Sequence, residues 1–155
     1  NLDNEGARAL MRGLRRMLGP ECLLILGLDI IKDRRLLENA YDDPEGVTAA
    51  FNLNVLERAN RELGTDFDTS RFRHRAIWNE ARSRIEMHLE ARSDMTVSLD
   101  DHVFSFREGE TLHTENSHKF DREKITALAQ GTGWKVMDMR VSGTPNVSLV
   151  LLKPA

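Results

Sequence analysis

One short apolar segment constrains the fold of this chain more than any other feature. Residues 22–27, Cys-Leu-Leu-Ile-Leu-Gly, are apolar at every position and follow the helix-stopping pair Gly19-Pro20 closely. Six residues are too few for a buried helix, and an unbroken apolar run is typical of a strand covered on both faces, as in a parallel sheet. The segment therefore predicts a buried strand of an α/β sheet. It ends in a polar loop at residues 27–29, the edge where such sheets place their ligands.

The two ends of the chain predict the rest of this sheet. Helical spacing of apolar residues predicts a helix before the strand, capped by Asp3 or Asn4 and stopped by Gly19-Pro20. Near the other end, Asp121 caps a predicted helix over 121–130. Two strands, 134–141 and 147–152, follow and are joined by a turn at 142–145.

The middle of the chain changes character. Two helices are predicted at 34–40 and 47–63, and in the second Val47, Phe51, Val55 and Ala59 share a face. From Phe72 the period becomes two, which predicts strands at 72–78, 84–90, 95–99, 102–106 and 112–115, with Asp100-Asp101 as a hairpin turn. We therefore expect a sheet domain, 1–33 with 120–155, and an inserted lobe, 34–119.

Composition excludes several classes of protein. The 155 residues carry 22 basic and 25 acidic side chains, a net charge of −3 that argues against a nucleic-acid-binding module. No apolar run approaches the length of a membrane span, and the acidic start does not resemble a signal peptide. A single cysteine, Cys22, in an apolar run predicts a reduced thiol and a cytoplasmic protein. The missing initiator Met leads us to expect that the chain begins mid-protein.

The histidines and arginines invite two further interpretations. His113, Glu115 and His118 could supply metal ligands, but their spacing fits no zinc signature, so we predict no metal site. The other histidines that alternate with apolar residues are expected on solvated strand faces; these are His74, His88 and His102. The basic run 71–75 is expected to form a charged outer strand face balanced by the acids of 42–68, and not to bind phosphates.

Two polar features leave structural and functional interpretations open. Tyr41 precedes the turn-rich loop 42–46 at the expected mouth between sheet and lobe, where it could pack or bind a ligand. Glu115 and Ser117 lie two residues apart, so a carboxylate and a hydroxyl could grip both nitrogens of an imidazole. On spacing alone, an ordinary solvated turn explains this pair more simply.

Several segments together carry a family resemblance. Residues 26–33 (LGLDIIKD) and 40–52 (AYDDPEGVTAAFN) with Asn54 resemble the histidine Nα-methyltransferases of ergothioneine biosynthesis. The segments 74–79 (HRAIWN), 85–87 (IEM) and 114–120 (TENSHKF) match in order and spacing. The resemblance runs essentially end to end but covers only the family's C-terminal half.

The resemblance implies a fold and an activity. The fold would be the C-terminal part of a class I, Rossmann-like S-adenosylmethionine-dependent methyltransferase sheet with an inserted α+β substrate-binding lobe. The activity would be methyl transfer to the α-amino group of L-histidine, giving the trimethylated betaine. The methyl donor would be bound mainly by the missing N-terminal half, so its binding residues here are unknown.

The resemblance also implies which residues bind substrate. Asn1 and Tyr41 would hold the amino-acid backbone end, Glu115 and Ser117 would bond the imidazole, and Met87 would pack beside it. It implies no catalytic nucleophile and no metal.

Alternatives to this function remain. One is a related methyltransferase acting on another aromatic amino acid or amine, although an indole has no need of both Glu115 and Ser117. Another is a non-catalytic binding module. We expect the fragment to be inactive alone and capable of self-association through an exposed sheet edge.

Overall fold

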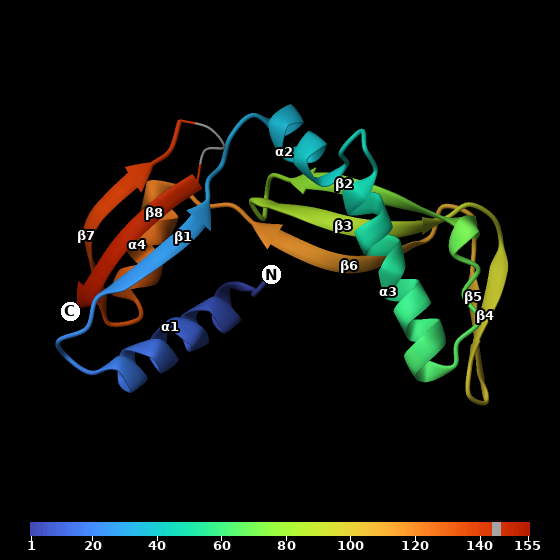
Figure 1. Ribbon diagram of the computed structural model, residues 1–155, viewed down its shortest axis with the longest axis horizontal. Helices are drawn as coiled ribbons and strands as arrows, with labels where there is room; N and C mark the ends of the chain where they lie inside the picture. The colour runs from blue at the N-terminus through green and yellow to red at the C-terminus, as the bar shows by residue number, and fades with distance from the viewer. Residues whose placement is uncertain (144–146) are drawn as a thin grey trace. The chain divides into compact units, whose positions relative to one another are not determined.

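The chain folds into two compact units, each with its own sheet (Figure 1). The computed structural model describes residues 1–143 and 147–155. We call residues 1–32, 80–84 and 117–155 the sheet unit, and residues 33–79 and 85–116 the lobe unit. The boundaries predicted from sequence, at 33/34 and 119/120, stay predictions.

The sheet unit joins both ends of the chain. It contains α1 (Asn4–Leu18), β1 (Leu24–Asp29), α4 (Arg122–Gln130), β7 (Trp134–Val141) and β8 (Val147–Pro154). The strand order is β1-β8-β7, and β8 runs antiparallel to both neighbours, so the two outer strands run parallel to each other. The predicted α/β class, with one sheet built from the two ends, is confirmed. Self-association through an edge of this sheet stays a prediction.

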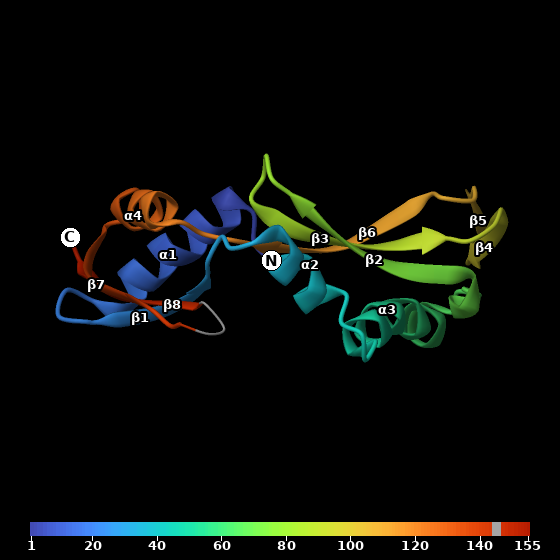
Figure 2. The same cartoon turned by 90° about the horizontal axis from the view of Figure 1, so that it is seen from above.

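One face of this sheet carries the core of the unit. Met11 of α1, Leu128 of α4 and Val150 of β8 pack together there, and α1 and α4 lie along the same face (Figure 2). The expectation that residues 22–27 would be covered on both faces is wrong for this chain. Burial alternates along β1, and Ile25 on its outer face is 69% exposed. The direct partner of β1 is the antiparallel β8, which reaches it from more than 100 residues away, beyond any local pattern.

Helix ends in this unit are set locally, as predicted. The Asp3 carboxylate accepts a hydrogen bond from the Gly6 N–H at 2.7 Å, and Asp121 does the same for Lys124 at 2.7 Å. These caps satisfy backbone donors that have no partner within the helix. The predicted loop at 27–29 belongs to β1, which ends at Asp29.

The lobe unit is a three-stranded sheet with two helices and a hairpin. Its helical elements are α2 (Arg34–Tyr41), α3 (Val47–Leu63) and the short η1 (Thr69–Arg71). The sheet has the order β2-β3-β6, and β4 pairs with β5. The strands are β2 (Phe72–Asn79), β3 (Arg84–Ala91), β4 (Met95–Leu99), β5 (His102–Phe106) and β6 (Thr111–His118). The predicted strands and hairpin are confirmed, and β6 is longer than expected.

Two apolar clusters hold this unit together. Leu56 of α3 packs with Phe72 and Leu89, and a second cluster joins Leu37 of α2 to Ile85 and Met87 of β3. On α3 the buried positions are Asn52 and Leu56. The apolar stripe noted in the sequence is largely exposed, at Val47, Phe51 and Val55.

The basic run 71–75 was expected to be balanced by the acids of residues 42–68, and the structure shows a different partner. Arg73 and Arg75 both form ion pairs with Glu90, whose side chain is buried, and not with the acids of residues 42–68. Arg73 and Arg75 lie two residues apart on β2, so they project from the same face of the sheet. Glu90 on the neighbouring strand β3 projects from that face too and can therefore pair with both. Of the predicted turn at 142–145, Thr144 and Pro145 lie outside the described residues. None of the described helices is long and apolar enough to cross a membrane.

Candidate functional site

A cleft of about 300 Å³ opens in the sheet unit at the carboxyl end of β1. Its lining includes Asn1, the Gly27–Asp29 segment, Ser117 and His118. The Asp3 cap fixes where α1 begins, so Asn1 lies just before the helix. The structure therefore brings Asn1 and Ser117, two of the five predicted site residues, to one cavity.

A buried lysine, Lys119, contacts two of the residues that line this cleft, Ser117 and Asp29. The Lys119 side chain is 0% exposed, and its Nζ donates to Ser117 Oγ at 2.5 Å and lies 3.2 Å from Asp29 Oδ2. The other Asp29 oxygen, Oδ1, pairs with Lys32 at 2.8 Å. An ammonium only donates, so Ser117 Oγ acts as an acceptor toward Lys119. The hydroxyl oxygen is thereby held in one place.

Tyr41 and Met87 belong to the same apolar cluster of the lobe unit. The Tyr41 ring packs against the cluster that contains Leu37 and Met87, and Met87 is buried there. The Tyr41 carbonyl lies 2.6 Å from His74 Nε2, and His74 Nδ1 lies 2.9 Å from Asn52 Nδ2. A carbonyl only accepts, so Nε2 must carry the hydrogen and Nδ1 accepts from the Asn52 amide. This chain of hydrogen bonds fixes the end of α2.

His74 therefore corrects a sequence expectation. It was expected on a solvated strand face, but it lies on the helix-facing side of β2, bonded to Asn52 of α3. His88 is also not solvated, with a side chain 13% exposed, whereas His102 is exposed as expected. Alternation with apolar residues identified the strands, but it indicated neither that the helices cover His74 nor that His113 of the neighbouring strand stacks on His88.

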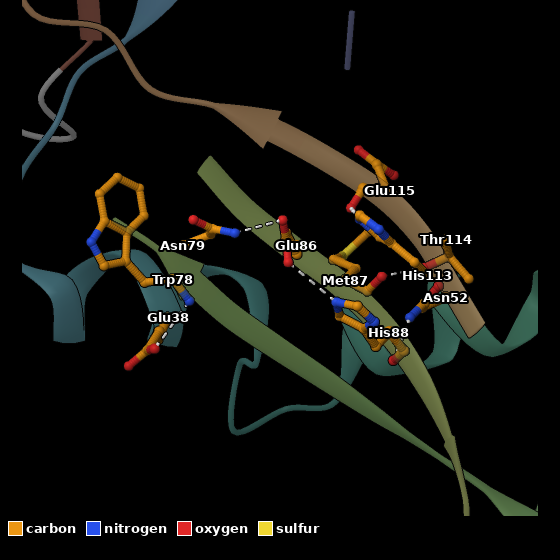
Figure 3. Close-up of polar contacts among 10 residues, drawn as sticks. All are labelled: Glu38, Asn52, Trp78, Asn79, Glu86, Met87, His88, His113, Thr114 and Glu115. Carbon is orange, nitrogen blue, oxygen red and sulfur yellow. Dashed lines mark hydrogen bonds and ion pairs between the residues drawn. The ribbon is translucent and has the colours of Figure 1, made fainter. Parts of the chain in front are cut away.

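Glu115 lies half-buried on β6. Within the described part of the chain, its carboxylate has no hydrogen-bond or ion-pair partner, although its carbonyl lies 3.2 Å from His113 Nε2 (Figure 3). Two residues apart on one strand, Glu115 and Ser117 project from the same face of β6. Leu112, of opposite parity, packs against the helix-side core. Met87 belongs to that helix side, so its contact with an imidazole held by Glu115 stays a prediction.

The possible metal ligands considered from the sequence, His113, Glu115 and His118, are not the group that the structure brings together. Across the described residues, the only set of three or more possible ligands is Glu86, His88 and His113, which includes neither Glu115 nor His118. Sequence reasoning missed this set because its members come from two strands 25 residues apart. It also missed the burial of Lys119, for which no local pattern gives a signal.

Comparison with known proteins gives consistent matches. A family model described as "Histidine-specific methyltransferase, SAM-dependent" matches residues 1–154. The histidine N-alpha-methyltransferase of Mycobacterium tuberculosis is 44% identical over 131 residues, which are 83% of this chain and 41% of that protein. That of Mycolicibacterium smegmatis is 48% identical over 112 residues, 71% of this chain and 35% of that protein. The chain thus spans about two fifths of the length of these relatives. A solved S-adenosylmethionine-dependent methyltransferase from Clostridium acetobutylicum aligns at 10% identity with a TM-score of 0.47, over 99% of this chain and 52% of that one.

Proposed function

Because the chain belongs to the S-adenosylmethionine-dependent, histidine-specific methyltransferase family, we propose that it is part of an enzyme that methylates the α-amino group of L-histidine. The product would be the trimethylated betaine, a step of ergothioneine biosynthesis. Relatives include an ergothioneine biosynthesis protein of Schizosaccharomyces pombe, 23% identical over 138 residues. A cytoplasmic location is part of the proposal and rests on the one free cysteine.

The observation that carries this proposal is the pairing of Glu115 with Ser117 on one face of β6. A neutral imidazole offers one N–H donor and one lone pair, so it suits a carboxylate beside a hydroxyl. Glu115 supplies a half-buried carboxylate, and Lys119 holds the Ser117 oxygen in place. We propose that the carboxylate accepts from one ring nitrogen while the hydroxyl bonds the other.

The amino-acid end of the substrate would be held by Asn1 and Tyr41. An amide can both donate and accept, and a phenol can do the same, which suits an amine and a carboxylate presented side by side. Asn1 lines the same cleft as Ser117, and the end of α2 at Tyr41 is fixed through His74. Met87 would pack beside the ring.

The ribose hydroxyls of S-adenosylmethionine call for a carboxylate at a strand end, and Asp29, at the end of β1, is already engaged by Lys32 and Lys119. We propose that the methyl donor is bound mainly by a part of the enzyme outside this chain.

The role of this chain would then be to bind and orient histidine. Attack by an amine requires its lone pair to be unprotonated and aligned, and orientation of this kind can remove on the order of 7–11 kcal/mol from a barrier. No protein nucleophile is needed for such a transfer. Selectivity would come from buried polar groups, because a side chain that leaves them unpaired is rejected strongly.

Mass spectrometry of the full-length enzyme, incubated with S-adenosylmethionine and each amino acid in turn, tests the proposal. We expect histidine to gain methyl groups. Methylation of another amino acid with histidine untouched would contradict the substrate, and no methylation at all would favour a non-catalytic module.

The role of Glu115 needs a matched pair of variants. Glu115→Ala leaves a ring N–H without its acceptor, a cost of roughly 1–3 kcal/mol, which corresponds to about 10- to 100-fold weaker histidine binding. Glu57→Ala removes an exposed carboxylate from α3 and should change nothing. Histidine binding by Glu115→Ala within two-fold of the unmodified enzyme would show that Glu115 is an ordinary surface acid.

A second candidate substrate class has one specific observation behind it. An N-methyltransferase of Aspergillus fumigatus is 32% identical over 126 residues, so the scaffold also occurs in proteins not named for histidine. Another aromatic amino acid or amine would then be the acceptor. The amino-acid series described above distinguishes the two substrate classes. In addition, an indole substrate should bind to Glu115→Ala no more weakly than to the unmodified enzyme.

A further inference from the structure

Three metal-ligating side chains converge on the lobe sheet, on the face that carries Glu90. Glu86 and His88 lie two apart on β3, so they project from the same face, and His113 comes from the neighbouring strand β6 (Figure 3). One ligand atom from each of the three lies within 4.8 Å of the others. The two imidazole rings stack, with centroids 4.5 Å apart.

His88 is the centre of this group. Its side chain is 13% exposed, and neither ring nitrogen has a hydrogen-bond partner among the residues that the structure describes. Glu86 Oε2 lies 3.6 Å from Nε2, which is too long for a hydrogen bond. Buried polar groups are nearly always hydrogen-bonded, so a largely buried ring whose two nitrogens make no hydrogen bond to the described residues requires an explanation such as a bound ion.

The other two side chains, His113 and Glu86, are each held by a hydrogen bond to a residue outside the group. His113 Nε2 lies 3.2 Å from the Glu115 carbonyl, and since a carbonyl only accepts, this nitrogen is the donor. The Asn79 amide donates to Glu86 Oε1 at 3.0 Å. Histidine and carboxylate ligands in metal sites are typically held by outer partners of these kinds.

From this convergence we propose that Glu86, His88 and His113 bind one divalent transition-metal ion, with Zn²⁺ as the best match. Two imidazoles and a carboxylate suit zinc, and three protein ligands leave a fourth position for water. A tetrahedral ion with bonds of about 2.1 Å holds its ligand atoms about 3.4 Å apart. The Glu86–His88 separation of 3.6 Å is already close to that value.

This site is separate from the proposed methyl transfer, which uses none of the three side chains. The sequence predicted no metal site. The three residues lie on two strands, β3 and β6, which become neighbours only in the folded sheet, so the sequence could not indicate that they meet. Glu115 contacts this site through its backbone carbonyl, which lies 3.2 Å from His113 Nε2.

Titration of metal-free full-length protein with Co²⁺, a spectroscopic substitute for Zn²⁺, tests the proposal. We expect visible absorption bands that saturate at one ion per chain and disappear on addition of Zn²⁺. His113→Ala should weaken binding by at least about 10- to 100-fold, the loss typical of removing even an outer-shell partner. His113 is exposed, so this variant should fold, which circular dichroism verifies.

His102→Ala is the matched control, because it removes another exposed strand histidine that lies outside the group. It should bind Co²⁺ as the unmodified protein does. Absence of a saturable spectrum, or equal binding by His113→Ala and the unmodified protein, would overturn the proposal.

Discussion

The buried pair of Lys119 and Asp29 makes the sharpest prediction about stability. Lys119 is 0% exposed, whereas Asp29 is 30% exposed and also contacts Lys32 at 2.8 Å. The two partners are therefore not equivalent. Loss of the carboxylate leaves a fully buried ammonium without the anion that it contacts, while loss of the ammonium leaves a carboxylate that still reaches Lys32 and water.

We expect Asp29→Asn to cost more than Lys119→Met. Breaking a buried ion pair from one side typically costs about 3–5 kcal/mol, and partial exposure of Asp29 places this case near 3 kcal/mol. Lys119→Met keeps a similar side-chain volume and removes the buried charge, so we expect about 1 kcal/mol. The double variant should resemble Lys119→Met, which gives a coupling free energy of about 3 kcal/mol in magnitude.

Urea unfolding followed by tryptophan fluorescence measures these free energies. The chain has two tryptophans, and Trp134 is buried in the sheet unit with Lys119, while Trp78 lies in the lobe unit. A Trp78→Phe background therefore makes Trp134 the reporter for the unit under test. If the losses of the two single variants simply add in the double variant, or if Lys119→Met is the more damaging change, the reasoning is refuted.

Three further predictions concern single side chains. Asn52→Ala should destabilise the lobe unit by about 1–3 kcal/mol in urea unfolding, because the 1% exposed amide bonds His74 and the His88 carbonyl; a loss under about 0.5 kcal/mol would contradict this. Trp134→Phe should lower the melting temperature, because it removes the buried indole N–H bond to the Met11 carbonyl; an unchanged temperature would count against that bond. Hydrogen bonds from Thr48, and then from the N–H of Val47, lower the pKa of Asp43 to about 2 from its usual 3.8. Its stabilisation is therefore full above pH 3.8 and lost as pH falls toward 2, so urea midpoints of Asp43→Ala and the unmodified protein should differ at pH 5 and converge at pH 2; a constant difference would argue against it.

The ends of the elements could be predicted because their causes are local. Asp3 and Asp121 cap helices through bonds to residues three positions away, and α3 begins and ends where glycines flank it. Period-two alternation placed β2 and β3 in the same way. The family could also be recognised, because a run such as residues 40–52 is a chemical pattern that needs no coordinates.

The sequence alone showed that Glu115 and Ser117 lie two residues apart, but the predicted strand ended at residue 115. Only the structure extends β6 to His118, so that the two side chains share one face of a strand. The sequence could not indicate that a buried Lys119 holds the Ser117 oxygen, because burial depends on what the rest of the chain places around that side chain. Residue spacing gave no sign that Tyr41 and Met87 belong to one apolar cluster, which forms only when α2 packs against the sheet.

Long-range pairing was decided by tertiary structure. The antiparallel partner of β1 is β8, from the far end of the chain, and the apolar run at 22–27 predicted burial on both faces instead. Likewise, alternation identified His74 and His88 as strand residues. The packed helices decide that His74 is covered, and the pairing of β3 with β6 decides that His88 stacks on His113. Caps and alternation act within a few residues, whereas strand partners and buried charges arise from segments that the chain brings together only on folding, so no local pattern encodes them.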